Sequence, residues 1–225
     1  MTKPSTITID GFAASGKSTV ALLLAQNLGY LYFDTGVMYR AVTWAVLDRA
    51  IDPANEENVS QLAEALLIEV VANGPDDGRQ NTVLVDGQDV TWDIRQPQVD
   101  AQVSMVASYP RVRTALTNQQ RRIGAAGSIV MVGRDIGTVV LPNADLKIFM
   151  EASAEERASR RYKQAVEQNQ AADYDAILAG IVQRDKLDKA NPVSPTVPAP
   201  DAIIVDTDNL TIDEVVAKLE KLASN

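Results

Sequence analysis

The sequence predicts an α/β fold, in which helices wind around a five-stranded parallel sheet that carries a small β-containing insert. Five short apolar runs rich in β-branched residues recur along the chain, and helical patterns follow the first two runs directly. A cluster of three short strand-like runs then interrupts this alternation. Alternating strands and helices favour parallel strands with crossover connections, and 225 residues are enough for one domain with a substantial core.

The first two strand–helix pairs lie near the N-terminus. Residues 5–10 predict a strand, and a helix is expected over residues 17–28, where Gly29 is well placed to end it. Residues 30–34 predict the second strand, and residues 37–50 the second helix. This order favours a parallel arrangement of the two strands.

The middle of the chain breaks the alternation. Residues 67–71 and 81–91 predict short strands, separated by the turn signals "NGPDDG" and "DG". Because three short strands lie close together, we interpret residues 63–103 as an inserted subdomain. Helical patterning resumes over residues 97–122.

The last three sheet strands and two polar helices follow. Residues 128–135, 146–150 and 202–207 predict strands, and residues 153–168 and 173–189 predict the helices between the last two. Together with the first two strands, they complete the expected five-stranded sheet.

Capping signals and prolines mark the C-terminal part. Ser153 with Glu156 forms a capping box for the first polar helix, and Thr211 with Glu214 forms one for a final helix. The segment "NPVSPTVPAPD", residues 191–201, contains prolines at short intervals. It is therefore expected to be extended and stiff.

Composition limits the chemistry that the chain can perform. It contains no cysteine and no histidine, and its net charge is −9. Disulfides, thiol nucleophiles, Cys/His zinc sites and imidazole bases are therefore excluded. The acidic charge argues against a nucleic-acid binder, and no apolar run has transmembrane length. We expect a cytoplasmic monomer with neither nucleic-acid nor membrane partners.

The stretch "GFAASGKST" has the spacing of a phosphate-binding loop between a predicted strand and a predicted helix. Phosphates need several inward-pointing N–H donors at once, and a loop that feeds a helix N-terminus supplies them with the helix dipole. Lys17 can reach the outer phosphates, and Ser18 can hold Mg²⁺. The alternative is a chance glycine turn with an exposed lysine. The residues expected at this triphosphate site are Gly11, Phe12, Ala13, Ala14, Ser15, Gly16, Lys17, Ser18 and Thr19.

Polar residues also follow the second and third predicted sheet strands, in "DTGVMYR" and "VGRDIGT". Because the carboxyl ends of parallel strands face the ligand crevice, Thr35, Arg134 and Asp135 are expected at the same edge of the sheet. Arg40 follows one turn into a helix. The alternatives are a helix cap with a surface arginine for the first stretch and a plain turn for the second.

Two clusters of arginines are further candidates for phosphate contacts. They comprise Arg111 and Arg113, and then Arg157, Arg160 and Arg161. The last three share one face of a predicted helix because their spacing is i, i+3, i+4. For each cluster the alternative is a solvated surface, with Glu156 paired to Arg160 in the second.

Taken together, these blocks resemble the bacterial cytidylate kinases over nearly the whole chain. The similarity is carried by "ITIDGFAASGKST", "DTGVMYR", "IRQPQV…VSMVASYPRVR", "GRDIGTVVLPNADLKIFMEAS", "ERASRRYKQ", "RDKLD" and "DAIIVDT". Many families share the phosphate loop, whereas "DTGVMYR", "PRVR" and "GRDIGTVV" are specific in combination. The resemblance implies the fold of a P-loop nucleoside monophosphate (NMP) kinase over a single domain, residues 1–225. It places an NMP-binding region at about 35–122, the insert at about 63–103 and a helical lid at about 153–191.

The resemblance also implies roles for individual residues. The expected CMP-binding residues are Thr35, Arg40, Ser104, Arg113, Arg134, Asp135 and Asp188. The expected catalytic residues are Lys17, Arg134, Arg157, Arg161 and Arg184. Arg40 and Arg134 match arginines that contact phosphate, and Ser104 with Arg113 matches residues that read cytosine. Arg95 is a further candidate.

One position departs from the family pattern. The family typically has an arginine three residues after the aspartate that matches Asp188, whereas this chain has Asn191. That phosphate contact therefore does not carry over, and Lys189 is a neighbouring cation that could replace it.

The implied activity is transfer of the γ-phosphoryl group of ATP to CMP or dCMP, with Mg²⁺ held by Ser18. Such chemistry needs positioning and charge neutralisation, so the lack of His and Cys is no obstacle. One alternative is another small-molecule or NMP kinase on the same scaffold, against which the insert and "GRDIGTVV" argue. Another is a nucleotide-operated switch like a small GTPase, but the Asn/Thr-Lys-x-Asp motif is missing from the sequence.

Overall fold

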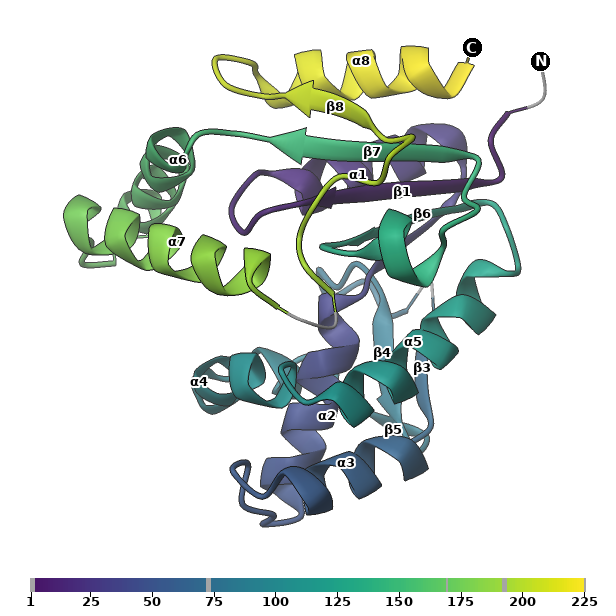
Figure 1. Cartoon of the computed structure of the whole chain (residues 1–225), viewed down its shortest axis with the longest axis vertical. Coiled ribbons are helices and arrows are strands. Elements are labelled where there is room, and N and C mark those ends of the chain that lie inside the picture. The colour runs from purple at the N-terminus through teal and green to yellow at the C-terminus, as the bar shows by residue number, and fades with distance from the viewer. Residues whose placement is uncertain (1–2, 72–73, 169, 192–193, 225) are drawn as a thin grey trace. The chain divides into compact units, whose positions relative to one another are not determined.

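The computed structural model describes residues 3–71, 74–168, 170–191 and 194–224 (Figure 1). The chain divides into two compact units, which we call unit 1 (residues 1–32 and 127–225) and unit 2 (residues 33–126). Part of the segment expected to be extended and stiff, residues 192–193, lies outside the described residues.

The main sheet has five strands in the order β2-β6-β1-β7-β8, and the prediction of a five-stranded parallel sheet is confirmed. The strands are β1 (Thr6–Gly11), β2 (Leu31–Asp34), β6 (Ile129–Gly133), β7 (Leu146–Glu151) and β8 (Ile203–Asp206). The helices of unit 1 are α1 (Lys17–Leu28), α6 (Ala154–Glu167), α7 (Tyr174–Lys189) and α8 (Ile212–Ser224), with the short π-helical turn η2 (Ile136–Val140). Within the described residues, no helix has both the length and the apolar character needed to cross a membrane.

One face of the main sheet packs against α1 and α8 to form the core of unit 1. Alternate residues of a strand point to opposite faces, so Ile7 and Ile9 of β1 both lie in this core. They are buried with Leu24 of α1 and Leu219 of α8. α1 ends where the sequence predicts, because Gly29 adopts a left-handed φ of 71° and donates its N–H to the last turn.

The other face of β1 carries buried polar residues. Thr8 and Asp10 lie on this face, and the Asp10 carboxylate accepts hydrogen bonds from the N–H groups of Ile136 and Gly137 in η2. The sequence pattern indicated a strand over residues 128–135 and did not predict η2, which begins at Ile136. Asp10 of the central strand therefore serves this turn and not the apolar core.

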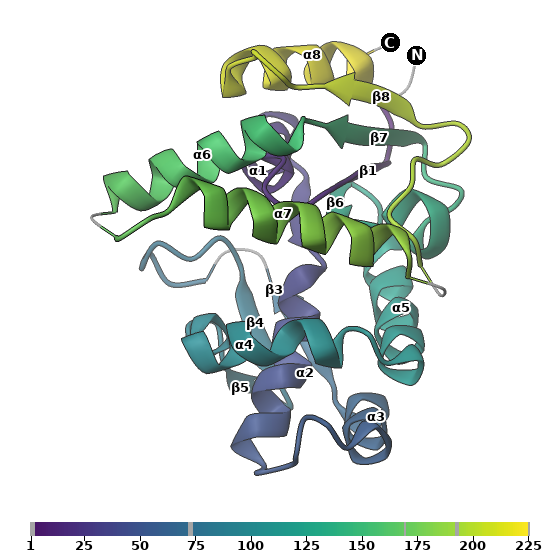
Figure 2. The same ribbon diagram turned by 60° about the vertical axis from the view of Figure 1, so that its left-hand side comes forward.

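The helices α6 and α7 lie side by side, as Figures 1 and 2 show, and both were predicted at these positions. At the start of α6, Ser153 Oγ accepts a hydrogen bond from Glu156 N (3.2 Å), but the Glu156 carboxylate pairs with Arg160 (2.8 Å). The capping box expected there is therefore half formed. The box before α8 is complete, because Thr211 N donates to Glu214 Oε2 (2.8 Å) and Glu214 N to Thr211 Oγ1 (3.3 Å).

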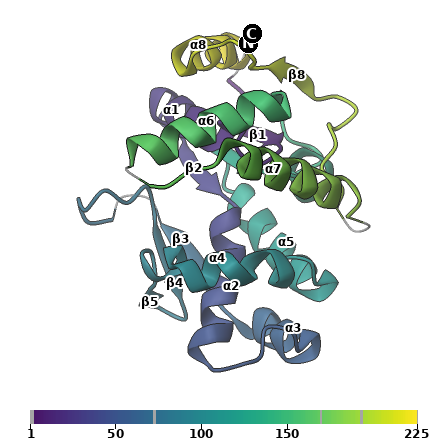
Figure 3. The same ribbon diagram turned by 90° about the vertical axis from the view of Figure 1, so that its left-hand side faces the viewer.

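Unit 2 combines a three-stranded antiparallel sheet with several helices (Figure 3). The strands β3 (Ile68–Val71), β4 (Thr82–Val85) and β5 (Gln88–Asp89) confirm the strands expected in the insert. The helical elements are α2 (Gly36–Asp48), α3 (Glu56–Ala65), η1 (Asp93–Arg95), α4 (Pro97–Val106) and α5 (Pro110–Gly124). α3 was not predicted. The helical pattern over residues 97–122 forms two helices, because Pro110 starts a new helix at its first position.

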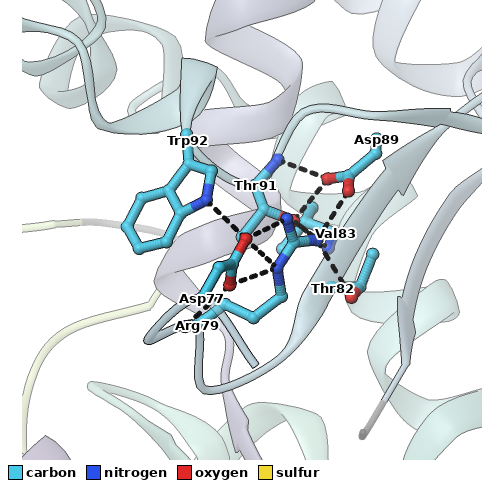
Figure 4. A network of polar contacts seen from close by, with 7 residues as sticks. All are labelled: Asp77, Arg79, Thr82, Val83, Asp89, Thr91 and Trp92. Atoms are coloured by element: carbon cyan, nitrogen blue, oxygen red, sulfur yellow. Dashed lines mark hydrogen bonds and ion pairs between the residues drawn. The ribbon is translucent and has the colours of Figure 1, made fainter. Parts of the chain in front are cut away.

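A polar clasp around Arg79 holds the turn before β4 against β5 (Figure 4). The Arg79 side chain is 7% exposed and pairs with Asp77 (2.6 Å) and Asp89 (2.5 Å). Trp92 Nε1 also donates to Asp77 (3.1 Å), and Thr91 Oγ1 donates to Asp89 (2.6 Å). The hydrogen bonds from Arg79 and then Thr91 lower the pKa of Asp89 to about 2. The hairpin is thus closed by charged contacts, where the sequence indicated only a turn.

Candidate active site

Residues 11–19, from the end of β1 through the connecting loop to the start of α1, have the geometry of a phosphate-binding loop. Gly11 adopts φ 154°, and a Cβ there would clash with the carbonyl oxygen of Met150, so only glycine fits. Gly16, at φ 82°, leads into α1, whose first N–H groups have no partner within the helix. These donors and the positive end of the helix dipole suit a bound anion.

Two side chains of this segment provide polar groups that can contact such an anion. Lys17 Nζ donates to the carbonyl oxygen of Phe12 (2.8 Å), so the ammonium group lies against the loop backbone. Ser15 is 1% exposed, and its Oγ has no hydrogen-bond partner in the described chain. A buried hydroxyl without a partner is costly, and a phosphate oxygen in the loop would satisfy it.

A cavity of about 630 Å³ opens beside the loop within unit 1. Residues 14–20 form one wall, Arg161 and Gln164 of α6 contribute to another, and Leu210 and Val215 add apolar surface. The volume lies in the range typical of small-molecule sites. The cavity therefore has the size and the lining for a nucleotide whose phosphates occupy the loop.

Arg157, which was expected to be a lid arginine, is buried and contacts the phosphate loop. It is 3% exposed, and both of its Nη atoms pair with the carboxylate of Asp185 on α7 (3.0 and 2.5 Å). Nη1 also donates to the Ala13 carbonyl oxygen (3.1 Å), and the guanidinium carbon lies 5.6 Å from the centre of the Phe12 ring. Arg157 therefore ties α6 and α7 to the backbone of the phosphate loop.

The other arginines of the two helices lie in different surroundings. Arg160 pairs with Glu156 (2.8 Å), as the alternative interpretation expected, and also donates to the Thr207 carbonyl oxygen (2.6 Å). Arg161 is exposed and lines the cavity, and Arg184 is exposed on α7. Among these side chains, Arg161 is thus the expected catalytic residue that borders the cavity directly.

The segment after β6 carries Arg134 and Asp135. Arg134 Nε pairs with Asp188 Oδ2 at the end of α7 (2.7 Å), so the structure brings these two expected CMP-binding residues together. Asp135 is buried next to η2. Its charge also raises the pKa of Asp10, although burial is the larger cause of that rise.

In unit 2, two contacts at one nitrogen atom hold Arg40. Its Nη1 donates to the Ile94 carbonyl oxygen (3.1 Å) and pairs with Asp100 Oδ1 (2.6 Å). The guanidinium group of Arg40 also carries N–H donors at Nε and Nη2. These two donors form an edge of the guanidinium group that can bind a phosphate with two hydrogen bonds.

The remaining CMP-binding candidates of unit 2 come from α2, α4 and α5. Arg113 Nη1 donates to a backbone carbonyl oxygen (3.1 Å), and its guanidinium carbon lies 5.4 Å from the centre of the Tyr39 ring. Ser104 is exposed on α4, and Thr35 is buried directly before α2. Because α2 and α4 pack together, Arg40 and Ser104 come from adjoining helices.

Three further polar residues of unit 2 have structural partners. Asp34 Oδ1 accepts a hydrogen bond from Gly36 N (2.9 Å), whereas the N-cap residue of α2 is Thr35, which makes no side-chain capping bond. Arg111 pairs with Glu57 (2.7 Å) and Glu64 (2.8 Å) on the surface, which matches the alternative of a solvated basic turn. Arg95 is exposed, and its guanidinium carbon lies 5.5 Å from the centre of the Trp92 ring.

The residues present fit Mg²⁺ when a phosphate-bearing ligand accompanies it. No group of three or more Asp or Glu side chains within the described ranges could hold an ion without such help. Ser18, the second residue of α1, lines the cavity beside the loop. Mg²⁺ is commonly held by few protein oxygens together with phosphate oxygens, and a loop hydroxyl is one of its usual ligands. The donor set therefore fits a magnesium–nucleotide complex with Ser18 as a protein ligand.

Three carboxylates that shape these sites were missed by the sequence reasoning. Asp185 pairs with Arg157, Asp100 pairs with Arg40, and Asp10 binds η2. Asp185 and Asp10 both lie within blocks that resemble the family pattern, "RDKLD" and "ITIDGFAASGKST". Their partners were not predictable from these blocks, because all three contacts depend on how distant segments meet in the fold.

Comparison with known proteins extends over nearly the whole chain. The family model described as "Cytidylate kinase" matches residues 7–225. A cytidylate kinase from Chloroflexus aggregans is 52% identical over 217 residues, which covers 96% of this chain and 93% of the relative. A cytidylate kinase from Roseiflexus castenholzii is 50% identical over 218 residues, covering 96% and 92%.

A solved structure, of an uncharacterized protein from Eubacterium ventriosum, shares the fold. Its TM-score is 0.53 at 14% sequence identity, and the similarity covers 99% of both chains. The family assignment rests on the sequence matches, because they are far closer than this structural one. The chain belongs to the cytidylate kinase family.

Proposed function

We propose that the protein transfers the γ-phosphoryl group of ATP to CMP or dCMP, which yields ADP and CDP or dCDP. The observation that carries this proposal is the similarity to two cytidylate kinases, at 52% and 50% identity over 96% of the chain. The phosphate loop and its cavity are consistent with the ATP side of this reaction. Action as a cytoplasmic monomer without nucleic-acid or membrane partners stays a prediction.

On the ATP side, residues 11–19 hold the phosphates through N–H donors. Lys17 moves its ammonium group from the Phe12 carbonyl oxygen to the outer phosphates. It loses a hydrogen bond to a neutral acceptor and gains one to a charged acceptor, which is stronger. Ser18, with Thr19 beside it, holds Mg²⁺. When bound, this ion neutralises part of the phosphate charge.

On the acceptor side, Arg40 and Arg134 bind the phosphate of CMP, and Ser104 with Arg113 reads the cytosine edge. A serine hydroxyl and a guanidinium can satisfy the amine, ring nitrogen and carbonyl oxygen of cytosine, whereas the second carbonyl of uracil would meet the wrong partner. The remaining acceptor contacts are assigned to Thr35, Asp135 and Asp188. In this proposal residues 35–122 form the NMP-binding region, with the insert at 63–103.

The residues at about 153–191 act as a lid over the transferred group. Arg161 and Arg184 offset the charge that develops during transfer, and arginines in this role contribute about 10³ to 10⁵ in rate in other phosphoryl-transfer enzymes. Arg157 supports them from its buried position and holds the loop backbone at Ala13. Closing the site excludes water and limits hydrolysis of ATP.

A panel of acceptors tests the proposed substrate. In a coupled assay with ATP, we expect CMP and dCMP to have kcat/KM values at least about 10²-fold above those of AMP, GMP and UMP. The reason is that a site built to hydrogen-bond one base edge leaves buried polar groups unpaired with another. If CMP and dCMP are no better than the other monophosphates, the proposal is wrong.

Restoring the missing arginine tests the acceptor side. We expect Asn191→Arg to tighten CMP binding about tenfold, because one added charge-assisted hydrogen bond is worth about 1.5 kcal/mol. Asn191 Oδ1 now accepts a hydrogen bond from Ser194 N (3.0 Å), and Asn191→Ala removes that contact without adding charge. Calorimetric titration with CMP should therefore show tighter binding for the arginine variant only. Unchanged or weaker CMP binding by Asn191→Arg would count against this assignment.

A further inference from the structure

Asp10 connects the strand that feeds the phosphate loop to the segment that carries Arg134 and Asp135. It lies on β1, the central strand of the main sheet, and is 5% exposed. Its Oδ1 accepts a hydrogen bond from Ile136 N (2.8 Å), and its Oδ2 accepts one from Gly137 N (2.7 Å). One carboxylate therefore binds the first two N–H groups of η2, more than a hundred residues along the chain.

Burying a carboxylate in this position costs free energy of folding unless its hydrogen bonds to backbone N–H groups offset that cost. Burial raises the pKa of Asp10 to about 6, the two N–H groups oppose that rise, and of the facing charges Asp135 raises the pKa while Lys17 lowers it. A hydrophobic residue would avoid this cost, as Ile7 and Ile9 do on the other face of the same strand. The carboxylate thus serves η2, where apolar packing could not provide two acceptors.

The backbone of η2 also lies unusually close to β1. A Cβ added at Gly137 would lie 3.0 Å from Thr8 Oγ1, 3.3 Å from Asp10 Oδ2 and 3.3 Å from Lys147 Cδ. Glycine at position 137 therefore allows the N–H group to reach the carboxylate. The hydrogen bond between these segments therefore depends on Asp10 in β1 and on Gly137 in η2.

We propose that Asp10 is a positioning residue for phosphoryl transfer, which fixes the backbone at residues 136–137 and so places Arg134 and Asp135 relative to the phosphate loop. All of these residues belong to unit 1. The inference rests on the proposed function, because Arg134 and Asp135 are assigned there to the acceptor. It adds a residue that touches no substrate and acts through the backbone of η2.

Asp145 provides a matched control at the other end of β1. Its Oδ2 accepts hydrogen bonds from Ser5 N (2.8 Å) and Thr6 N (2.9 Å), so it too binds two successive N–H groups with one carboxylate. It belongs to neither the phosphate loop nor the acceptor segment. Asp145 is exposed and uses one oxygen for both bonds, so the carbonyl oxygen of an asparagine can keep them. Asp145→Asn therefore removes a carboxylate charge beside β1 without the buried donor conflict that Asp10→Asn creates.

The test compares Asp10→Asn, Gly137→Ala and Asp145→Asn with the wild-type chain. In Asp10→Asn one oxygen becomes an NH₂ group that faces an N–H donor, so η2 must shift. We expect kcat/KM for CMP to fall about 10- to 100-fold, because small displacements of positioning groups have effects of this size. We also expect the Kd for ATP to change less than threefold. Gly137→Ala should show the same pattern to a smaller extent, and Asp145→Asn should leave kcat/KM unchanged.

A measurement without substrate separates this inference from the proposed function. Amide hydrogen exchange at Ile136 and Gly137 should be faster in Asp10→Asn than in the wild-type protein. If the wild-type chain does not phosphorylate CMP but this exchange increases, the proposed function fails and the contact stands. The inference is overturned by unchanged exchange, or by a folded Asp10→Asn whose kcat/KM for CMP stays within threefold of wild type. Equal losses in Asp10→Asn and Asp145→Asn would overturn it as well. If Asp10→Asn does not fold, Gly137→Ala decides by the same criteria.

Discussion

Replacing Lys17 with alanine is expected to lower kcat by about 10³-fold or more. The lysine is the first residue of α1, and its ammonium group already lies over the phosphate loop, 2.8 Å from the Phe12 carbonyl oxygen. A charge placed where negative charge develops during transfer is typically worth 10² to 10³ in rate, and phosphate loops rely on this lysine for the outer phosphates. The coupled assay with saturating ATP and CMP measures the loss directly.

The fold should survive this change, since the partly buried hydrogen bond to the Phe12 carbonyl oxygen is worth only about 1 kcal/mol. Circular dichroism and the melting temperature check that point. Lys218→Ala is the matched control, because it removes the same charge from an exposed position on α8 and should leave kcat unchanged. A Lys17→Ala enzyme that keeps a tenth of the wild-type kcat would contradict the role assigned to this lysine.

The parts of the fold that were predicted correctly depend on neighbours in the sequence. The end of α1 follows from Gly29 and the start of α8 from Thr211 with Glu214, and each signal lies within a few residues of the helix it ends or begins. The strands of the main sheet were likewise visible as short apolar runs. Local chemistry therefore carries most of the information about where these elements begin and end.

The parts that were missed depend on contacts between distant segments. α3 has a capped start, with Asn55 Oδ1 accepting from Asn58 N (3.1 Å), but its polar composition hid it among turn signals. η2 exists where Asp10 supplies acceptors from 126 and 127 residues away, and no pattern within residues 132–140 shows that. The position of Arg157 is a third case. The spacing of three arginines on α6 predicted one shared face, but burial against α7 separates Arg157 from the exposed Arg161.

Replacing Asp185 with alanine is expected to lower the free energy of unfolding by about 3–5 kcal/mol. Arg157 is 3% exposed, and Asp185 is the carboxylate that balances its charge. Removing one partner of a buried ion pair leaves an uncompensated charge, and that situation has a cost of this size. Urea unfolding curves with the same slope for both proteins would give the difference.

The exposed pair between Arg49 and Asp86 is the control for this prediction. Both of its side chains are more than 40% exposed, so Arg49→Ala should cost less than about 1 kcal/mol. The double variant Arg157→Met/Asp185→Ala should recover part of the lost stability, because an apolar pair can replace a buried ion pair at little cost. Its activity should stay low, since no guanidinium then donates to the Ala13 carbonyl oxygen and supports the phosphate loop. If Asp185→Ala lowers stability no more than Arg49→Ala does, the pair is not the buried support that this fold indicates.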